Sequence, residues 1–386
     1  MIVENHPLLI NGGEALAAFV DSLQRIDVLA VDLEADSLYH YHEKICLMQL
    51  ATENRIALVD PLDIAEMSLL KPVFENPDVL KIFHGADYDI RSLFRDFGFC
   101  VGPIFDTELA SRFLGNRHSG LEAVLKERFG VQVDKRFQKK DWSKRPLSDE
   151  MLHYAAQDVQ YLIPLHRMLH QELMDCGRLD WVREECERLS RVRYADDGNE
   201  PHFLRFKGAG KLKPRSLSAL EELLIFRDRE ARKADRPAFK VLENRALLAI
   251  ASSLPATLNE LKSLHVLSPR QVDRFGKELV DIVQQQCRKP ADQLRCFPHN
   301  GSPNRDPKYT ERLAMLKQMR SQLSESLAID PGLLCNNVLL GRIAGSEALS
   351  IERLSALDGM KNWQIDLLGP RILETLSSAP GVRIEK

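Results

Sequence analysis

The sequence lacks the features that mark secreted, disulfide-bonded and membrane-spanning proteins. Its seven cysteines are scattered without a Cys-x-x-Cys pair, so we expect neither a zinc site nor a disulfide framework. No run approaches about 18 consecutive apolar residues, the length that a membrane-spanning helix needs. The segment Met1–Leu8 has no basic region followed by an apolar core, so no signal peptide is expected. These absences predict a cytoplasmic protein with no membrane partner.

A strong overall charge is also absent, but the charge is unevenly distributed. The chain has 386 residues and a formal net charge of −3, and this length predicts two or three domains. Residues 1–200 carry a net charge of −12, whereas residues 201–290 carry +8. A basic segment after an acidic one favours nucleic-acid binding, because cations attract phosphates and release counterions. Charge differences of this size also occur in ordinary proteins, so this signal alone is weak.

What the sequence does contain is an acidic pair inside an apolar run. Asp32 and Glu34 lie in Val28-Leu-Ala-Val-Asp-Leu-Glu-Ala35, which reads as a buried strand. Side chains two apart in a strand share one face, so both carboxylates point the same way. Carboxylates in a sheet interior are costly unless they are paired or bound to metal. The pair therefore predicts a divalent cation with oxygen ligands.

Further acidic residues follow at suggestive positions. Asp89 comes shortly after a second apolar strand, Val79–Phe83, and Asp158 lies inside a long helical pattern. Tyr154 and Asp158 are four residues apart and share one helix face. Four carboxylates and one phenol can thus converge on a pair of metal ions, which in general serves in-line phosphoryl displacement. Any one of these patterns is weak alone; their order along the chain makes the signal strong.

Taken together, these residues resemble the tyrosine branch of the four-carboxylate 3′–5′ exonucleases. The segments Phe83–Ile90, Phe105–Thr107 and Asp141–Leu147 are similar to ribonuclease D and its exosome-associated relatives. The C-terminal half resembles the helical helicase-and-RNase-D C-terminal (HRDC) module, once clearly and once weakly. The resemblance implies an α/β ribonuclease-H-like exonuclease domain with a mixed sheet, followed by two all-α HRDC-like domains.

The resemblance also implies a role for each residue of the site. Asp32, Glu34 and Asp158 would hold the metal that activates water, and Asp32 would bridge to a second metal. Asp89 would complete the site directly or through water, and Tyr154 would orient the attacking water. Two Mg²⁺ ions are expected, with Mn²⁺ able to substitute, because all ligands are hard oxygens. The implied activity is release of nucleoside 5′-monophosphates from RNA with a free 3′ end, with tRNA precursors as substrates.

The order of elements sets the predicted boundaries. We expect strands at Val28–Glu34, Ile45–Ala51, Ile56–Asp60 and Val79–His84, the first three as an antiparallel meander. Helical patterns follow at Ala86–Asp96, Thr107–Leu114, Gly120–Phe129 and Ser148–Met174, and capping signatures at Ser218, Thr257, Ser268 and Asp330 predict later helix starts. Linkers are predicted at 196–214 and 284–307. The predicted domains are 1–195, 215–287 and 306–386.

A basic stretch directly precedes the Tyr154 helix. It contains Lys135, Arg136, Lys139, Lys140, Lys144 and Arg145, with Phe137 and Trp142 among them. These cations are predicted to bind the nucleic-acid backbone, and Trp142 either stacks on a base or packs inward. His84 is expected to be a structural residue at a strand end, and Asp106 is expected to cap the next helix.

Two rival functions remain at this point. The same carboxylates serve a 3′–5′ DNA exonuclease, because only 2′-hydroxyl contacts distinguish RNA, and the sequence does not reveal them. A non-catalytic nucleic-acid-binding scaffold is the other rival, and the complete set of four acids and one tyrosine argues against it. Few cues for assembly are present, so a monomer is expected.

Overall fold

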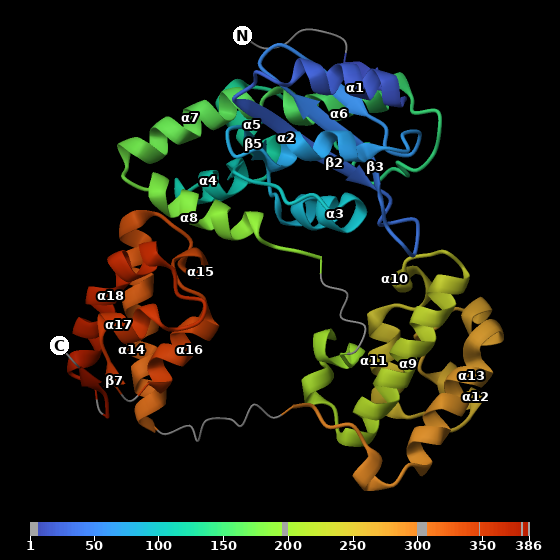
Figure 1. Cartoon of the computed structure of the whole chain (residues 1–386). Helices are drawn as coiled ribbons and strands as arrows, with labels where there is room; N and C mark the ends of the chain where they lie inside the picture. Colours follow the sequence, from blue (N-terminus) through green and yellow to red (C-terminus); the bar gives the residue numbers. More distant parts are fainter. Residues whose placement is uncertain (1–6, 195–199, 299–306, 347, 380, 385–386) are drawn as a thin grey trace. The chain divides into compact units, whose positions relative to one another are not determined.

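The computed structural model describes residues 7–194, 200–298, 307–346, 348–379 and 381–384, and the chain forms two compact units (Figure 1). One unit comprises residues 1–35, 45–194 and 303–386, and the other comprises residues 36–44 and 195–302. The two predicted linkers lie partly outside the described residues. Among the described residues, no helix is long and apolar enough to cross a membrane.

A six-stranded mixed sheet forms the centre of the first unit. Its strands lie in the order β1-β4-β3-β2-β5-β6, with β2–β3 and β3–β4 antiparallel and the other three pairs parallel. The bounds are β1 Leu8–Ile10, β2 Val28–Ala35, β3 Ile45–Ala51, β4 Ile56–Val59, β5 Leu80–Phe83 and β6 Ile104–Asp106. The four predicted strands and the meander are confirmed. β1 and β6 were not predicted, because three residues are too few to show an alternating pattern.

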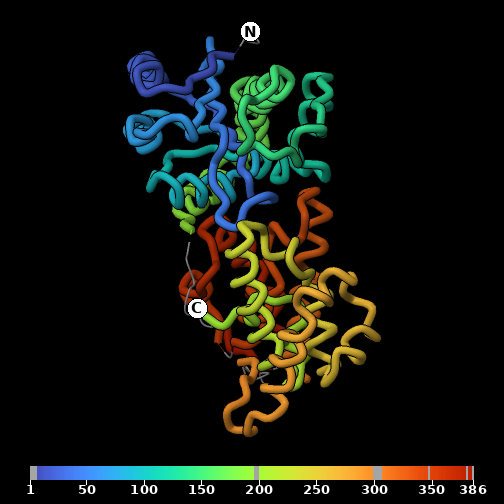
Figure 2. The backbone as a smooth tube through the Cα atoms, turned by 90° about the vertical axis from the view of Figure 1, so that its right-hand side faces the viewer, coloured from blue at the N-terminus to red at the C-terminus, as the bar shows by residue number. Residues whose placement is uncertain are grey.

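Helices cover both faces of this sheet (Figure 2). Leu29 and Val31 of β2 belong to the apolar core shared with α1 (Gly13–Ser22), α2 (Lys71–Glu75) and α3 (Asp87–Phe97). Ala30 points to the other face and packs with α6 (Asp149–Gln160) and α7 (Leu162–Asp175). Because side chains alternate along a strand, Asp32 and Glu34 share the face of Ala30 and point toward α6.

The long helix predicted over Ser148–Met174 is wrong, because the structure forms two helices there. α6 ends at Gln160 and α7 begins at Leu162, with Tyr161 between them. Pro164 lacks the backbone N–H that would bond the carbonyl of Gln160, so the helical bonding pattern is interrupted at this point. Ser148 caps α6, since its side chain accepts a hydrogen bond from the Met151 backbone N–H at 3.3 Å.

The remaining helices of this part of the unit lie between β4 and residue 194. They are a 3₁₀ turn at Met67–Leu70, α4 Thr107–Phe113, α5 Leu121–Phe129 and α8 Leu179–Ser190. The predicted cap at Asp106 is confirmed, because its carboxylate accepts hydrogen bonds from the N–H groups of Glu108 and Leu109. The same carboxylate also accepts from Gly85 and Ala86, and it therefore joins the end of β5 to the start of α4.

The C-terminal helices pack on α8 within the same unit. They comprise α14 Pro307–Leu327, α15 Pro331–Leu334, α16 Asn337–Gly345, α17 Ile351–Ser355 and α18 Asn362–Ser377, with two short strands β7 Ala348–Leu349 and β8 Arg383–Ile384. The Trp363 ring stacks on Trp181 with centroids 5.2 Å apart, and it meets Phe113 edge-on. Glu184 accepts hydrogen bonds from the N–H groups of Asn362 and Trp363, so α8 caps the start of α18.

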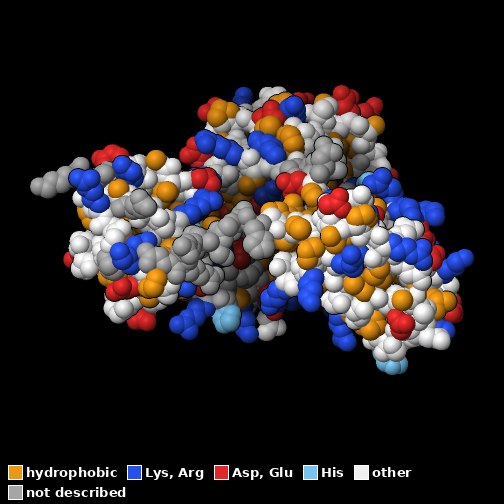
Figure 3. Space-filling model, turned by 90° about the horizontal axis from the view of Figure 1, so that it is seen from below, with side chains coloured by type: hydrophobic (Ala, Val, Ile, Leu, Met, Phe, Trp, Pro, Cys, Tyr) orange, Lys and Arg blue, Asp and Glu red, His pale blue; other side chains and the backbone are white. Residues whose placement is uncertain are grey.

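The second unit is helical and basic. It comprises α9 Pro214–Lys233, α10 Ala238–Val241, α11 Asn244–Ser253, α12 Leu258–Ser263, α13 Pro269–Arg288 and 3₁₀ turns at His202–Arg205, Ala209–Lys211 and Ala291–Gln293. Its exposed faces carry many Lys and Arg side chains, drawn in blue at the right of Figure 3. The sequence-derived excess of positive charge in this segment is therefore displayed on its surface.

Two of the three helix starts predicted in the second unit are confirmed, and one is wrong. Thr257 caps α12, and Ser268 with Gln271 forms a capping box at α13, both as predicted. The start predicted at Ser218 is wrong, because α9 already begins at Pro214. Glu221 is buried and accepts hydrogen bonds from the N–H groups of His202 and Phe203. Its carboxylate thus closes the preceding turn and does not cap its own helix.

Candidate active site

Three of the predicted acidic residues meet at one point. Asp32 and Glu34 project from β2, and Asp158 faces them from α6. One carboxylate oxygen from each residue lies within 4.8 Å of the others. Such spacing allows one cation to be bound by all three residues.

Asp89 lies close behind this group. It is the third residue of α3 and is buried, with 7 % of its surface exposed. Its charge acts on Glu34, and the charge of Asp32 acts on Asp89. The structure therefore places Asp89 in the same electrostatic environment, although it is not one of the three residues that meet within 4.8 Å.

Burial makes these carboxyls weak acids. Burial raises the pKa of Asp32 from 3.8 to about 7. Burial also raises the pKa of Glu34, Asp89 and Asp158 well above their ordinary values, and the negative charges of neighbouring acids add to each shift. A divalent cation relieves both costs, since it neutralises the charges and replaces their lost hydration. The donor set is oxygen only, so it fits a hard cation.

Tyr154 is held by two rings of the basic stretch. It lies one helical turn before Asp158, and its hydroxyl donates a hydrogen bond to the Asp158 carboxylate. Its ring lies between Phe137 and Trp142, with centroids 5.8 and 6.1 Å away. Trp142 is only 1 % exposed, so the base-stacking interpretation is wrong and the inward-packing alternative holds. Burial and the Asp158 charge raise the pKa of Tyr154, which keeps its hydroxyl protonated at neutral pH.

Arg145 has a structural role that its position in a basic stretch did not predict. Its guanidinium donates to both carboxylate oxygens of Asp60, at 2.5 and 2.6 Å, and to the Cys46 and Trp142 carbonyls, each at 2.7 Å. These bonds anchor the 134–145 segment to the ends of β3 and β4. Arg145 is thus engaged by the protein, and we remove it from the predicted phosphate-binding residues.

The other five cations of the stretch are exposed. Lys135 pairs with Glu122, Arg136 with Asp134 at 2.6 Å, and Lys144 with Asp141 at 3.7 Å. Pairs between exposed charges are weak, typically below about 1 kcal/mol, so a phosphate can compete for these side chains. Lys139 lies in the turn at 136–139, and Lys140 follows it.

A cavity of about 430 Å³ opens over the acidic group. Sequence reasoning missed three polar residues of its lining, namely Glu108, Glu122 and Gln138. Glu108 follows β6, and the carboxyl ends of the parallel strands β5 and β6 meet at one edge of the sheet. Recognising the three-residue strand β6 would have drawn attention to it. His84 also lines the cavity, and its Nδ1 lies 2.9 Å from the Thr107 hydroxyl, consistent with its predicted structural role.

Gln49 is a further polar residue that the sequence analysis missed. It lies opposite Asp32 in the β2–β3 register and is fully buried. Neither atom of its amide has a hydrogen-bond partner in the described part of the chain. The signal was available, because a glutamine inside the apolar run Ile45–Ala51 is as unusual as the acids of β2.

The fold and this acidic site define a 3′–5′ exonuclease with an appended helical domain. The family model described as "3'-5' exonuclease" matches residues 9–174, and the HRDC domain model matches residues 216–283. The chain is 32% identical over 384 residues to ribonuclease D of Nitrobacter hamburgensis, covering 98% of this chain and 97% of that relative. This chain belongs to the ribonuclease D family and is a 3′–5′ exoribonuclease.

Solved structures agree with this assignment. The crystal structure of Escherichia coli RNase D, described as an exoribonuclease involved in structured RNA processing, superimposes with a TM-score of 0.77 at 27% identity. The superposition covers 97% of this chain and 100% of the Escherichia coli chain. The catalytic core of RRP6 from Trypanosoma brucei gives a TM-score of 0.61 at 32% identity, covering 74% of this chain and 84% of that one.

The raised pKa values generate a prediction for the metal-free chain. Between pH 3.8 and about 7, folded Asp32 keeps a proton that the unfolded chain has released. The free energy of unfolding therefore falls as the pH rises through this window. In chelator, Asp32→Asn should raise the melting temperature at pH 8 by several degrees, and the gain should shrink toward pH 4. Differential scanning calorimetry across this range measures the effect.

The matched control is Asp21→Asn, which removes an exposed carboxylate of α1. Its melting temperature should follow the wild-type pH profile. Adding Mg²⁺ should stabilise the wild type more than Asp32→Asn. A wild-type chain whose stability in chelator rises steadily from pH 4 to pH 8, in parallel with Asp32→Asn, would contradict the raised pKa of Asp32 on which this prediction rests.

Proposed function

We propose that this exoribonuclease uses two divalent ions, Mg²⁺ with Mn²⁺ as a substitute, to release nucleoside 5′-monophosphates from RNA 3′ ends. The observation that carries the proposal is the meeting of three carboxylates, those of the half-buried Asp32 and Glu34 and of the buried Asp158, within 4.8 Å of one another. Their raised pKa values support it, because a cation is what such a group needs. We further propose tRNA precursors as substrates and a monomer as the active form.

Asp32, Glu34 and Asp158 would hold one ion, Asp32 would bridge to the second, and Asp89 would complete the set. Bound ions of this kind activate a water and stabilise the leaving 3′ oxygen of an in-line displacement. The remaining work belongs to the chain's own residues. The Tyr154 hydroxyl donates its hydrogen bond to Asp158, so its oxygen lone pairs remain to accept a hydrogen bond from a water O–H. Because this hydroxyl stays protonated, Tyr154 orients the water and does not act as the base.

RNA would be held by two basic surfaces. Lys139 and Lys140 extend from the segment that carries Phe137 and Trp142, close to the cavity lined by Lys135 and Gln138. The second surface is the helical unit, whose HRDC match spans 216–283. Both would bind phosphates without reading sequence.

The first prediction tests the chemistry. Asp158→Asn should abolish hydrolysis while the chain stays folded, because the variant keeps the side-chain shape and removes one metal-binding charge. The assay measures nucleotides released from matched 3′-hydroxyl RNA and DNA and from a tRNA precursor, with Mg²⁺, Mn²⁺ or chelator. Chromatography of the products should give 5′-monophosphates from RNA.

Asp149→Asn is the control, because Asp149 lies on the same helix in its exposed first turn. It should retain wild-type turnover. Near-native turnover by Asp158→Asn would sink the proposed site, and equal activity on DNA would favour the DNA exonuclease alternative. Sedimentation of the same preparations tests the monomer.

A second prediction isolates the Tyr154 hydroxyl. Tyr154→Phe keeps the ring between Phe137 and Trp142 and removes only the hydrogen bond to Asp158. The single-turnover rate should fall by about 10²-fold, the scale on which one positioned catalytic contact acts. RNA affinity should be nearly unchanged. Tyr161→Phe, at the junction of α6 and α7, is the control and should not change the rate. If Tyr154→Phe were as fast as Tyr161→Phe, Tyr154 would have a packing role alone.

A third prediction concerns the basic segment. The double variant Lys139→Ala, Lys140→Ala should weaken RNA binding and flatten its salt dependence. Each phosphate contact on single-stranded RNA contributes about 0.7 to the slope of log affinity against log salt, so losing two should lower the slope by about 1.4. Titrations use the Asp158→Asn background so that RNA survives. The double variant Arg25→Ala, Lys71→Ala removes two cations that do not line the acidic cavity, and its salt slope should match that of the parent. If the Lys139→Ala, Lys140→Ala variant also kept the parent's slope, RNA would have to bind elsewhere on the chain.

A further inference from the structure

A second cavity of about 520 Å³ lies between the start of β5, β6, α7 and α8. Its volume is within the range of small-molecule sites, about 300–1,000 Å³. It shares no lining residue with the acidic cavity. Its apolar part is formed by Leu80, Pro103, Ile104, Phe105 and Leu179.

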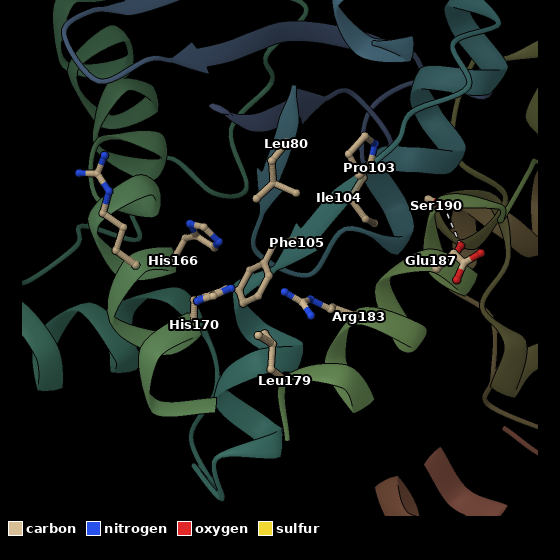
Figure 4. A pocket seen from close by; sticks show the side chains of 11 residues that line it. Leu80, Pro103, Ile104, Phe105, His166, His170, Leu179, Arg183, Glu187 and Ser190 are labelled. Carbon is tan, nitrogen blue, oxygen red and sulfur yellow. Dashed lines mark hydrogen bonds between the residues drawn. The ribbon is translucent and has the colours of Figure 1, made fainter. Parts of the chain in front are cut away.

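Polar groups stand at the rim of this apolar floor (Figure 4). The Arg183 side chain reaches from α8 toward the ring of Phe105, and His170 lies on the α7 side of the same ring. Glu187 and Ser190 line the other end of the cavity. The Arg183 guanidinium donates to Asp180 at 3.0 Å, and both side chains are largely exposed, so this pair is weak and an anion can replace it.

His166 defines the electrical character of the inner wall. Its ring meets Phe105 edge-on with centroids 4.6 Å apart, and neither ring nitrogen has a hydrogen-bond partner in the described structure. Burial, with the neighbouring His170 and Arg167, lowers the pKa of His166 to about 4. The His166 ring is therefore uncharged at neutral pH. Arg167, on α7, pairs with Glu53, and Arg183 is the cation that α8 contributes to this lining.

We propose that this cavity binds one nucleotide unit, with the base on the apolar floor around Phe105 and the phosphate on Arg183. Aromatic and aliphatic walls suit the flat face of a base, and a guanidinium fork suits phosphate oxygens. Glu187 and Ser190 offer partners for ribose hydroxyls. The inference rests on the proposed function for its source of nucleotide, because each turnover would release one nucleoside monophosphate and shorten a strand made of the same units.

The test measures binding without catalysis. Adenosine 5′-monophosphate is titrated into the full chain by calorimetry in chelator, so that the acidic site holds no metal. Arg183→Ala should weaken binding at least tenfold, and Arg183→Lys should restore part of the loss because it keeps the charge but not the fork. Arg188→Ala is the matched control, since Arg188 is an exposed cation of α8 outside the lining, and it should bind as the wild type does.

Four further arms fix the location and the chemistry. Asp32→Asn should leave binding unchanged, whereas loss of binding in that variant would move the nucleotide to the acidic site and overturn the proposal. Adenosine alone and inorganic phosphate alone should each bind more weakly than the monophosphate, since each reaches only half of the cavity. A five-residue oligoadenylate tests the strand as the source.

Binding of the monophosphate that depends on Arg183 identifies free nucleotide as an occupant. Arg183-dependent binding of the oligonucleotide alone identifies a strand segment, and either result supports the nucleotide chemistry. The proposal is overturned if neither the monophosphate nor the oligonucleotide binds at up to millimolar concentration. It is also overturned if Arg183→Ala and the wild type bind with equal affinity. Hydrolysis of a short oligonucleotide by Arg183→Ala should stay at the wild-type rate, so a failure here is distinguishable from a failure of the proposed catalytic site.

Discussion

The cost of desolvating carboxyls on one face of β2, to which the charges of neighbouring acids add, is the constraint around which the rest of the domain is organised. Asp32 and Glu34 share that face because they are two residues apart in a strand. Asp158 approaches them from α6, so that one carboxylate oxygen of each residue lies within 4.8 Å of the others. The sheet supplies the rigidity, because Leu29 and Val31 fill the opposite face with apolar contacts. A stable apolar layer on one side of a strand thus holds an electrostatically unfavourable layer on the other.

The segment between α5 and α6 contributes to this constraint from a distance. Arg145 fixes its end to Asp60 and to the Cys46 carbonyl, and Phe137 and Trp142 then enclose the Tyr154 ring. Arg145, Phe137 and Trp142 lie in a stretch that the sequence predicted to bind nucleic acid. In the structure these three residues hold the Tyr154 side chain in place. Within these eleven residues, Trp142 is buried and holds the Tyr154 ring, whereas five of the six cations are exposed to solvent.

The sequence predicted the strands that form mainly apolar runs of at least four residues, and it missed β1 and β6, which have only three residues each. A polar residue in an apolar strand drew attention to Asp32 and Glu34, whose carboxylates lie near that of Asp158 in the structure. The same signal applies to Lys81, which is also fully buried, yet its ammonium donates to the carbonyls of Asn76, Val79 and Gly102. Only the three-dimensional partners separate a satisfied charge from a site. For the same reason, sequence could not reveal that Arg145 is engaged by Asp60, 85 residues away.

The docking of α18 on α8 has a consequence for biosynthesis. Trp363 is synthesised 179 residues after its hydrogen-bond partner Glu184. Phe113 and Trp181, which pack against Trp363, also precede it in the chain. At a ribosomal rate of about 5–20 residues per second, that interval is on the order of ten to forty seconds. Throughout it, the nascent exonuclease domain carries an uncovered aromatic surface. The C-terminal helices therefore cover that surface only when the chain is nearly complete, and a chain that stops before Trp363 leaves it exposed.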